Sequence, residues 1–190
     1  SYSTSFKYSG HTDFLKNYFN SDPLMLMISG ELRIALLTDH IPLKNVLDFI
    51  NKDIVEKKIK VLEKCLVNDF KINKPKIAVL AINPHAGDNG LIGNEDELII
   101  KPVINSFTGN TSTVYGPFSA DTFFTNENYK KYDAIIAAYH DQGLIPFKTI
   151  SFGKGVNFSA GLSFIRTSPD HGTGFDIAGK GMADHTSFTN

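Results

Sequence analysis

The sequence predicts an α/β fold with a largely parallel central sheet. Short apolar runs bounded by turn residues, typical of buried strands, alternate along the chain with segments of helical periodicity. Three of these runs lead into a histidine, directly or within three residues, and ligands bind at the carboxyl ends of strands in such sheets. A length of 190 residues with 42% apolar residues is sufficient for one domain with a substantial core.

The first expected strands cover residues 23–29 and 33–38, and the second leads into Asp39-His40. Pro42 suits the first turn of a helix. The apolar face of that helix would be formed by Leu43, Val46, Leu47 and Ile50.

Residues 54–70 carry apolar side chains at intervals of three and four, which predicts an amphipathic helix with Cys65 packed near its apolar face. A strand follows at 75–82 and runs into a loop rich in Gly, Asn and Asp. We expect a helix over 95–104 capped by Asn94, and a short helix capped by Ser119. A last buried strand, 133–139, leads into His140.

Composition excludes several classes of function. The formal charge of −1 and the lack of a basic stripe argue against nucleic-acid binding. The sequence contains no run of about 18 apolar residues, so we expect no transmembrane helix. The single Cys65 cannot form an internal disulfide, and the polar start of the chain is unlike a signal peptide, so we expect a reducing, cytoplasmic location.

Ionisable residues and glycines are concentrated between Tyr139 and Asp184. Lys148 and Arg166 are suited to hold an anion, Arg166 in bidentate fashion. His140 and His171 are candidates for metal binding or proton transfer. Each assignment has a simpler alternative: the histidines are incidental, and the carboxylates nearby cap helices or turns.

The chain resembles the 4-hydroxythreonine-4-phosphate dehydrogenase family of vitamin B6 biosynthesis. The resemblance rests on seven motifs in the family's order: SGHTD at 9–13, DHIPL at 39–43, NPHAG at 83–87, GPFSADT at 116–122, YHDQG at 139–143, GKGVN at 153–157 and RTSPDHGT at 166–173. Any one motif alone is a weak signal, whereas seven in order across nearly the whole chain are specific.

The resemblance implies oxidation of 4-phosphohydroxy-L-threonine by NAD or NADP, followed by loss of carbon dioxide to give 3-amino-2-oxopropyl phosphate. It also implies a divalent metal held by three histidines, which would lower the pKa of the substrate hydroxyl. All-histidine ligation suits zinc or cobalt better than magnesium alone.

The family's site residues fall on this sequence position by position. The implied metal ligands are His11, His40 and His140, although His11 read by itself is equally a solvated loop residue. The implied substrate contacts are Lys148, Asn157 and Arg166. Candidates for proton transfer or for support of the ligands are Asp121 and Asp141. A segment similar to the cofactor loop of isocitrate and isopropylmalate dehydrogenases assigns His171, Gly172 and Asp176 to the dinucleotide.

The family further implies a three-layer α/β/α domain of the isocitrate/isopropylmalate dehydrogenase-like type. Family members carry a long segment before SGHTD and a helical tail, which together form a second domain. Residues 1–190 are therefore expected to be the metal- and substrate-binding dimerisation domain of a homodimer whose active site lies at the interface, and to be poorly active alone. Two alternatives stay open: a related metal-dependent hydroxy-acid dehydrogenase, and an inactive metal-binding dimerisation fragment.

Overall fold

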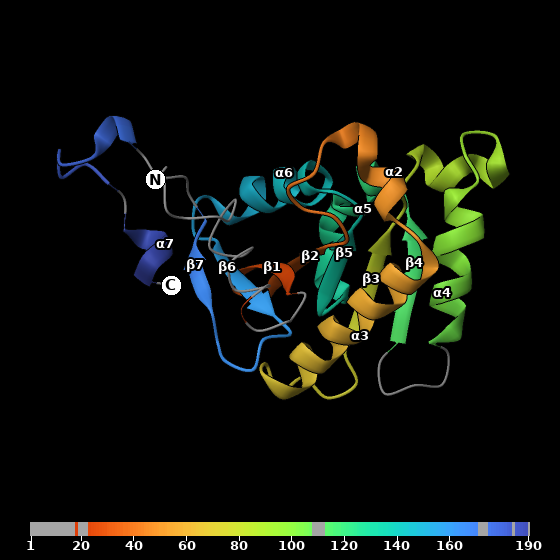
Figure 1. Cartoon of the computed structure of the whole chain (residues 1–190), viewed down its shortest axis with the longest axis horizontal. Helices are drawn as coiled ribbons and strands as arrows, with labels where there is room; N and C mark the ends of the chain where they lie inside the picture. The colour runs from red at the N-terminus through yellow and green to blue at the C-terminus, as the bar shows by residue number, and fades with distance from the viewer. Residues whose placement is uncertain (1–17, 19–22, 108–112, 171–174, 184, 190) are drawn as a thin grey trace.

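One seven-stranded sheet organises the molecule (Figure 1). The computed structural model describes residue 18 and residues 23–107, 113–170, 175–183 and 185–189. The strand order is β4-β3-β5-β2-β1-β6-β7. The strands are β1 (Leu24–Ser29), β2 (Leu32–Leu36), β3 (Lys76–Leu80), β4 (Thr113–Phe118), β5 (Ala134–Ala137), β6 (Val156–Ala160) and β7 (Thr167–Pro169).

The sheet is mixed, and the expectation of a largely parallel sheet is correct only for half of it. Strands β4, β3, β5 and β2 pair in parallel. The pairs β2-β1, β1-β6 and β6-β7 are antiparallel. The reason is local: only Gly30 and Glu31 separate β1 from β2, and a two-residue connection permits antiparallel pairing alone.

The helices lie on both faces of the sheet and give it three layers. They are α2 (Val46–Phe49), α3 (Lys52–Asn68), α4 (Lys101–Ser106), α5 (Ala120–Phe123), α6 (His140–Ser151) and α7 (Thr186–Thr189). Segments with 3-10 or π-helical turns are η1 (Leu43–Asn45), η2 (Pro84–Gly90), η3 (Asp96–Ile100), η4 (Thr125–Lys131) and η5 (Phe175–Ile177). None of the helices in the described part of the chain is long and apolar enough to cross a membrane.

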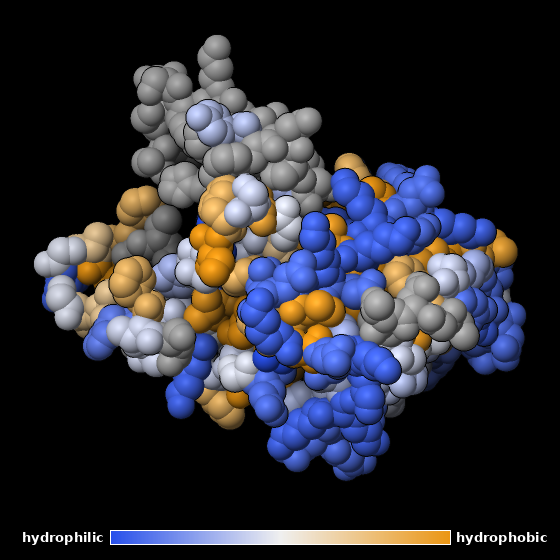
Figure 2. Space-filling view, turned by 90° about the horizontal axis from the view of Figure 1, so that it is seen from below, coloured by the Kyte–Doolittle hydropathy of each residue, from blue (hydrophilic) through white to orange (hydrophobic). Residues whose placement is uncertain are grey.

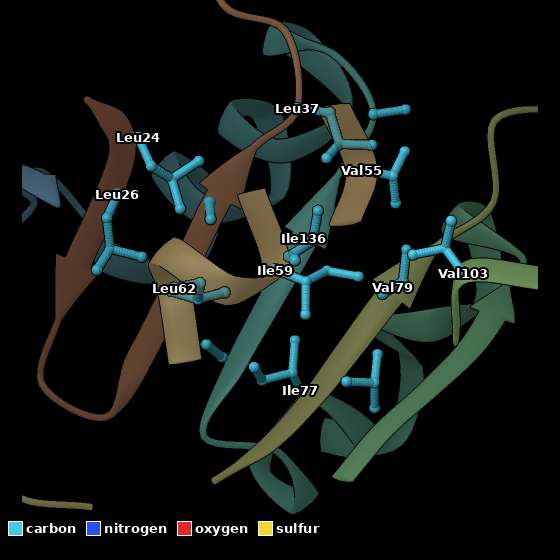
Figure 3. Close-up of a cluster of buried hydrophobic side chains, with 14 of the residues drawn as sticks. Leu24, Leu26, Leu37, Val55, Ile59, Leu62, Ile77, Val79, Val103 and Ile136 are labelled. Carbon is cyan, nitrogen blue, oxygen red and sulfur yellow. The ribbon is translucent and has the colours of Figure 1, made fainter. Parts of the chain in front are cut away.

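Two cores form because successive residues of a strand face opposite sides. On one side, α3 and α4 cover Ile77, Val79 and Ile136, as Figure 3 shows. On the other side, α6 covers a second cluster that contains Ala78 and Ala137. Alternate residues of β3 and β5 therefore belong to different cores, which explains why both strands are apolar throughout.

The helix predicted over 54–70 is α3, which begins after an Asn51 side chain that accepts a hydrogen bond from the Ile54 amide at 3.0 Å. Its lysines lie towards solvent, and hydrophilic residues predominate on the face of the molecule shown in Figure 2. Cys65 is buried, and burial together with Asp69 raises the pKa of its thiol to about 12. Cys65 is therefore an unreactive core residue, as the sequence predicts.

The helix expected after Pro42 forms only as the short pair η1 and α2, and its predicted apolar face is divided. Val46 and Ile50 are buried, whereas Leu43 and Leu47 are 70% and 49% exposed. The helix expected over 95–104 begins at Asp96 with the π-helical segment η3. No side chain caps its start, so Asn94 is not a cap. Ser119 does precede α5, again without a capping side-chain bond.

Candidate functional site

Two neighbouring parallel strands bring His40 and His140 together. The pairing of β2 with β5 continues past both strands, where the amides of Leu37 and Thr38 donate to the carbonyls of Ala137 and Ala138 at 2.9 and 3.2 Å. Because each histidine follows two residues after this pairing, both emerge at the same edge of the sheet. Their ring centroids lie 5.6 Å apart.

The imidazole pair borders a cavity of about 310 Å³. Polar groups on one side come from Asp39, His40 and Asp141, and apolar groups come from Ile41 and Leu43. The strongly exposed Leu43 thus lies at the cavity, which gives this cavity an apolar wall next to its imidazoles.

A carboxylate orients one of the two rings. The Nδ1 atom of His140 lies 2.7 Å from Oδ1 of Asp141, so that Nε2 is the nitrogen left for another partner. This pairing of imidazole and carboxylate is the usual arrangement around metal-binding histidines. The support of a metal ligand by Asp141 stays a prediction.

The spacing of the rings fits a shared divalent ion. Two imidazoles bound at about 2.0–2.1 Å to one tetrahedral ion place their ring centroids roughly 5 Å apart. The separation of 5.6 Å between His40 and His140 is close to that value. Among the described residues no group of three His, Cys, Asp or Glu side chains is placed to hold a metal ion. The predicted third ligand, His11, lies outside the described residues.

A second, smaller cavity places His40 beside two of the predicted substrate contacts. It is lined by His40, Asn157, Ser159 and Arg166, among others. Asn157 and Ser159 alternate along β6 and so share one face. Arg166 precedes β7, and its Nη1 atom donates to Ser159 Oγ at 3.1 Å. His40 is common to both cavities.

Asn157, which lines this cavity, carries an unused hydrogen-bond acceptor. Its Oδ1 atom is buried and has no hydrogen-bond partner among the described residues. A buried polar atom without a partner costs about 1–3 kcal/mol. Such a cost is offset when a donor on a ligand meets the atom.

Lys148 does not line either cavity. Its Nζ atom lies 3.2 Å from Oδ1 of Asp170 and donates to the Asp170 carbonyl at 3.1 Å. It stands eight residues after His140 on α6, about 12 Å along the helix axis. The structure thus places two of the three predicted substrate contacts in a cavity with His40, whereas the third, Lys148, is bonded to Asp170 next to β7.

The other predicted residues are farther away or outside the described part. Asp121 is exposed on α5 and lines neither cavity. Asp176 lies in η5. The predicted cofactor residues His171 and Gly172 lie outside the described residues. His85, the third histidine after a strand, is exposed in η2 and does not join the imidazole pair.

Several residues that support this edge of the sheet were not predicted. Asp39 lines both cavities, and its carboxylate accepts from the His40 amide at 2.8 Å. Gln142 contacts the ends of two strands, and Asp96 accepts from two amides that follow β3. Only the position of Asp39 beside His40 was a signal in the sequence. The other two contacts join distant segments.

Comparison with known proteins agrees with the geometry. The family described as pyridoxal phosphate biosynthetic protein PdxA matches residues 2–190. A 4-hydroxythreonine-4-phosphate dehydrogenase of Bacteroides thetaiotaomicron is 44% identical over 98% of this chain and 52% of its own length. One from Sulfurihydrogenibium is 46% identical over 97% of this chain and 57% of its own length.

Solved structures give the same result. A crystal structure of a 4-hydroxythreonine-4-phosphate dehydrogenase from Klebsiella pneumoniae superposes with a TM-score of 0.84 at 41% identity, covering 95% of this chain and 55% of that one. A terephthalate 1,2-cis-dihydrodiol dehydrogenase from Burkholderia xenovorans superposes with a TM-score of 0.72 at 32% identity, covering 95% and 58%. The chain spans about half the length of the curated relatives it matches. It belongs to the PdxA family of pyridoxal phosphate biosynthetic proteins.

Proposed function

We propose that this chain supplies the metal- and substrate-binding half of a 4-hydroxythreonine-4-phosphate dehydrogenase. The reaction oxidises 4-phosphohydroxy-L-threonine with NAD or NADP to 2-amino-3-oxo-4-phosphooxybutanoate. That β-keto acid loses carbon dioxide and becomes 3-amino-2-oxopropyl phosphate. The observation that supports this most directly is the position of His40, which borders both the imidazole cavity and the cavity of Asn157 and Arg166.

His40 and His140, together with His11, would hold a divalent ion such as zinc, cobalt or magnesium. When bound, such an ion lowers the pKa of a coordinated hydroxyl and stabilises negative charge on oxygen. Asp141 would accept a hydrogen bond from the Nδ1–H group of His140 and so leave Nε2 free to bind. Leu43 and Val46 add apolar groups to the lining of the same cavity.

Arg166 and Asn157 are placed to bind the polar groups of the substrate. A guanidinium binds a carboxylate or phosphate through two parallel hydrogen bonds. Asn157 Oδ1 would accept from a donor such as the substrate's amino or hydroxyl group. Lys148 would reach a phosphate only by exchanging its bond to Asp170 for one to the ligand.

The dinucleotide would lie at the segment of His171, Gly172 and Asp176, with Asp121 as a proton-transfer candidate. The support for these four assignments is the family's motif pattern. The sequence carries neither a G-x-G-x-x-G nor a Walker pattern, so a cofactor site outside a Rossmann turn is needed.

A test of the substrate assignment compares the wild-type chain with Arg166→Leu. We expect the variant to bind 4-phosphohydroxy-L-threonine at least about tenfold more weakly, because a charge-assisted hydrogen bond contributes about 1.5–3 kcal/mol. Isothermal calorimetry with added Zn²⁺ measures this. Lys101→Gln, which removes an exposed cation paired with Glu97, is the control and should bind normally. Equal affinities for wild type and Arg166→Leu would contradict the assignment.

The chain is further proposed to be one domain of a two-domain subunit in a homodimer whose active site lies at the interface. Two observations support this: the chain covers only about half the length of its relatives, and the apolar side chains of Leu43, at the cavity, and of Leu47 are exposed. We expect formation of NADH by these 190 residues alone to be far slower than by a full-length relative, as followed by absorbance. Equal turnover would rule out this division of the protein.

A second candidate is a dehydrogenase for an unphosphorylated diol or hydroxy acid. The likeness to the terephthalate dihydrodiol dehydrogenase favours it. In the calorimetric experiment, tighter binding of an unphosphorylated hydroxy acid than of the phosphorylated substrate would select this candidate. Metal binding without affinity for either substrate would select the non-catalytic dimerisation fragment.

A further inference from the structure

The backbone of Ala138 is held on both sides by side chains. The Oε1 atom of Gln142 accepts a hydrogen bond from the Ala138 amide at 2.7 Å. The hydroxyl of Thr38 donates to the Ala138 carbonyl at 2.8 Å. Ala138 is completely buried, and Thr38 is 7% exposed, so water does not compete for these bonds.

The two residues joined by the second bond, Thr38 and Ala138, occupy equivalent sequence positions relative to the two histidines. Thr38 lies two residues before His40, and Ala138 lies two residues before His140. The bond from Thr38 to Ala138 therefore joins the two strand ends immediately before the imidazoles diverge from the sheet. It reinforces a backbone bond between the same residues, whose 3.2 Å length is at the long end of the usual range.

Gln142 adds a third strand to this arrangement. Its Nε2 atom donates to the carbonyl of Ala81, which follows β3, at 2.8 Å. Gln142 is in the first turn of α6, two residues after His140. One amide side chain thus links the start of the helix that carries His140 to the ends of both β5 and β3.

We propose that Gln142 and Thr38 are positioning residues that fix the separation and orientation of His40 and His140 by holding Ala138. This inference rests on the proposed function in so far as the imidazole pair serves a metal. The separation and orientation of the two rings can be measured in the absence of a metal. These hydrogen bonds of Thr38 and Gln142 join backbone groups, so both side chains act on the imidazoles through the backbone.

The experiment uses Gln142→Met, which keeps the length of the side chain and removes both hydrogen bonds. The probe is the nuclear Overhauser effect between ring protons of His40 and His140 in the metal-free chain with labelled histidine. We expect the effect to be present in the wild type, strongly reduced in Gln142→Met and partly reduced in Thr38→Val. Gln142→Glu keeps the acceptor for Ala138 and should retain more of the effect than Gln142→Met.

Two controls separate positioning from stability. Leu62→Ala, on the buried face of α3, lowers the unfolding midpoint, and Figure 3 shows this side chain away from Leu37, the residue that follows β2. Thr149→Val removes an exposed hydroxyl that bonds within α6 to Ile145. Both should keep the wild-type ring contact. An unchanged contact in Gln142→Met, or an equal loss in Leu62→Ala, would overturn the proposal.

Cobalt binding then distinguishes this inference from the proposed function. We expect Gln142→Met to bind Co²⁺ about tenfold more weakly than the wild type, with a changed visible spectrum, since supporting residues around metal ligands commonly contribute 10–100-fold to affinity. A wild-type chain that binds no Co²⁺, while its ring contact still depends on Gln142, would refute the metal site and leave the positioning role standing. If the wild type binds Co²⁺ tightly and Gln142→Met has the same affinity and the same ring contact, the metal site stands and the positioning role is refuted.

Discussion

Replacing His140 by alanine is expected to reduce the affinity of the chain for Zn²⁺ by more than about 100-fold. Loss of a residue that merely supports a ligand already costs 10–100-fold, and loss of the ligand itself costs more. The expectation follows from the 5.6 Å separation of the two rings and from the bond between His140 and Asp141. Isothermal calorimetry near pH 7.5, with light scattering to record the oligomeric state, measures it.

The matched control for that experiment is His185→Ala, which removes an exposed imidazole near the end of the chain. It should bind zinc like the wild type. Equal affinity in His140→Ala and the wild type would show that zinc binds at some other place. Absence of binding in a folded wild type would mean that the site needs the remaining length of the family's chains.

Replacing Asp96 by alanine is expected to lower the free energy of unfolding by about 3 kcal/mol or more. The carboxylate is fully buried and accepts from the amides of Ile82 and Asn83 at 2.8 and 3.0 Å. Each donor left without a partner costs about 1–3 kcal/mol. The side-chain amide of Asn83 loses a third bond, at 3.1 Å.

Urea denaturation followed by circular dichroism measures this difference. Asp96→Asn should be intermediate, because its amide oxygen still accepts one of the bonds. The neighbouring Glu97→Gln is the control: it breaks an exposed pair with Lys101 and should change stability by less than about 1 kcal/mol. A loss in Asp96→Ala no larger than in Glu97→Gln would contradict the role given to Asp96.

The imidazole pair was predictable because its cause is visible in the sequence. Residues 33–38 and 133–139 are apolar runs that bring a histidine to each strand end. Their adjacency, however, required the strand order, and β2 lies beside β5 across about 100 residues of sequence. His85 shows the limit of the argument, since it follows β3 yet is exposed in a turn with positive φ angles.

Helix α6 was not predicted, and its sequence explains why. Gly143 and Pro146 both disfavour the interior of a helix. Gly143 is needed because a Cβ atom there would lie 2.7 Å from Leu36 and 3.0 Å from Ala137, so the helix packs directly on the sheet. Gly143 thus permits close packing of α6 on the sheet, and its low helix propensity is one reason why the sequence did not predict this helix.

The contacts of Gln142 and Asp96 could not be predicted from the sequence at all. Each joins a side chain to backbone groups that lie in another segment, as far away as Ala81 is from Gln142. No local sequence pattern predicts such a bond, because a glutamine or aspartate side chain can equally be hydrated at the surface. These two residues became identifiable only when the ends of β3 and β5 were placed side by side.

The turn at Gly30 has a practical consequence for experiments on this chain. A Cβ atom at Gly30 would meet nothing within 4 Å, although its φ of +57° favours glycine or asparagine. The turn precedes β2, whereas His40 follows it, and the length of β2 separates the two by about 17 Å. A fluorescent dye or an immobilising tag attached at Glu31 would therefore report on the molecule from the opposite end of the same strand.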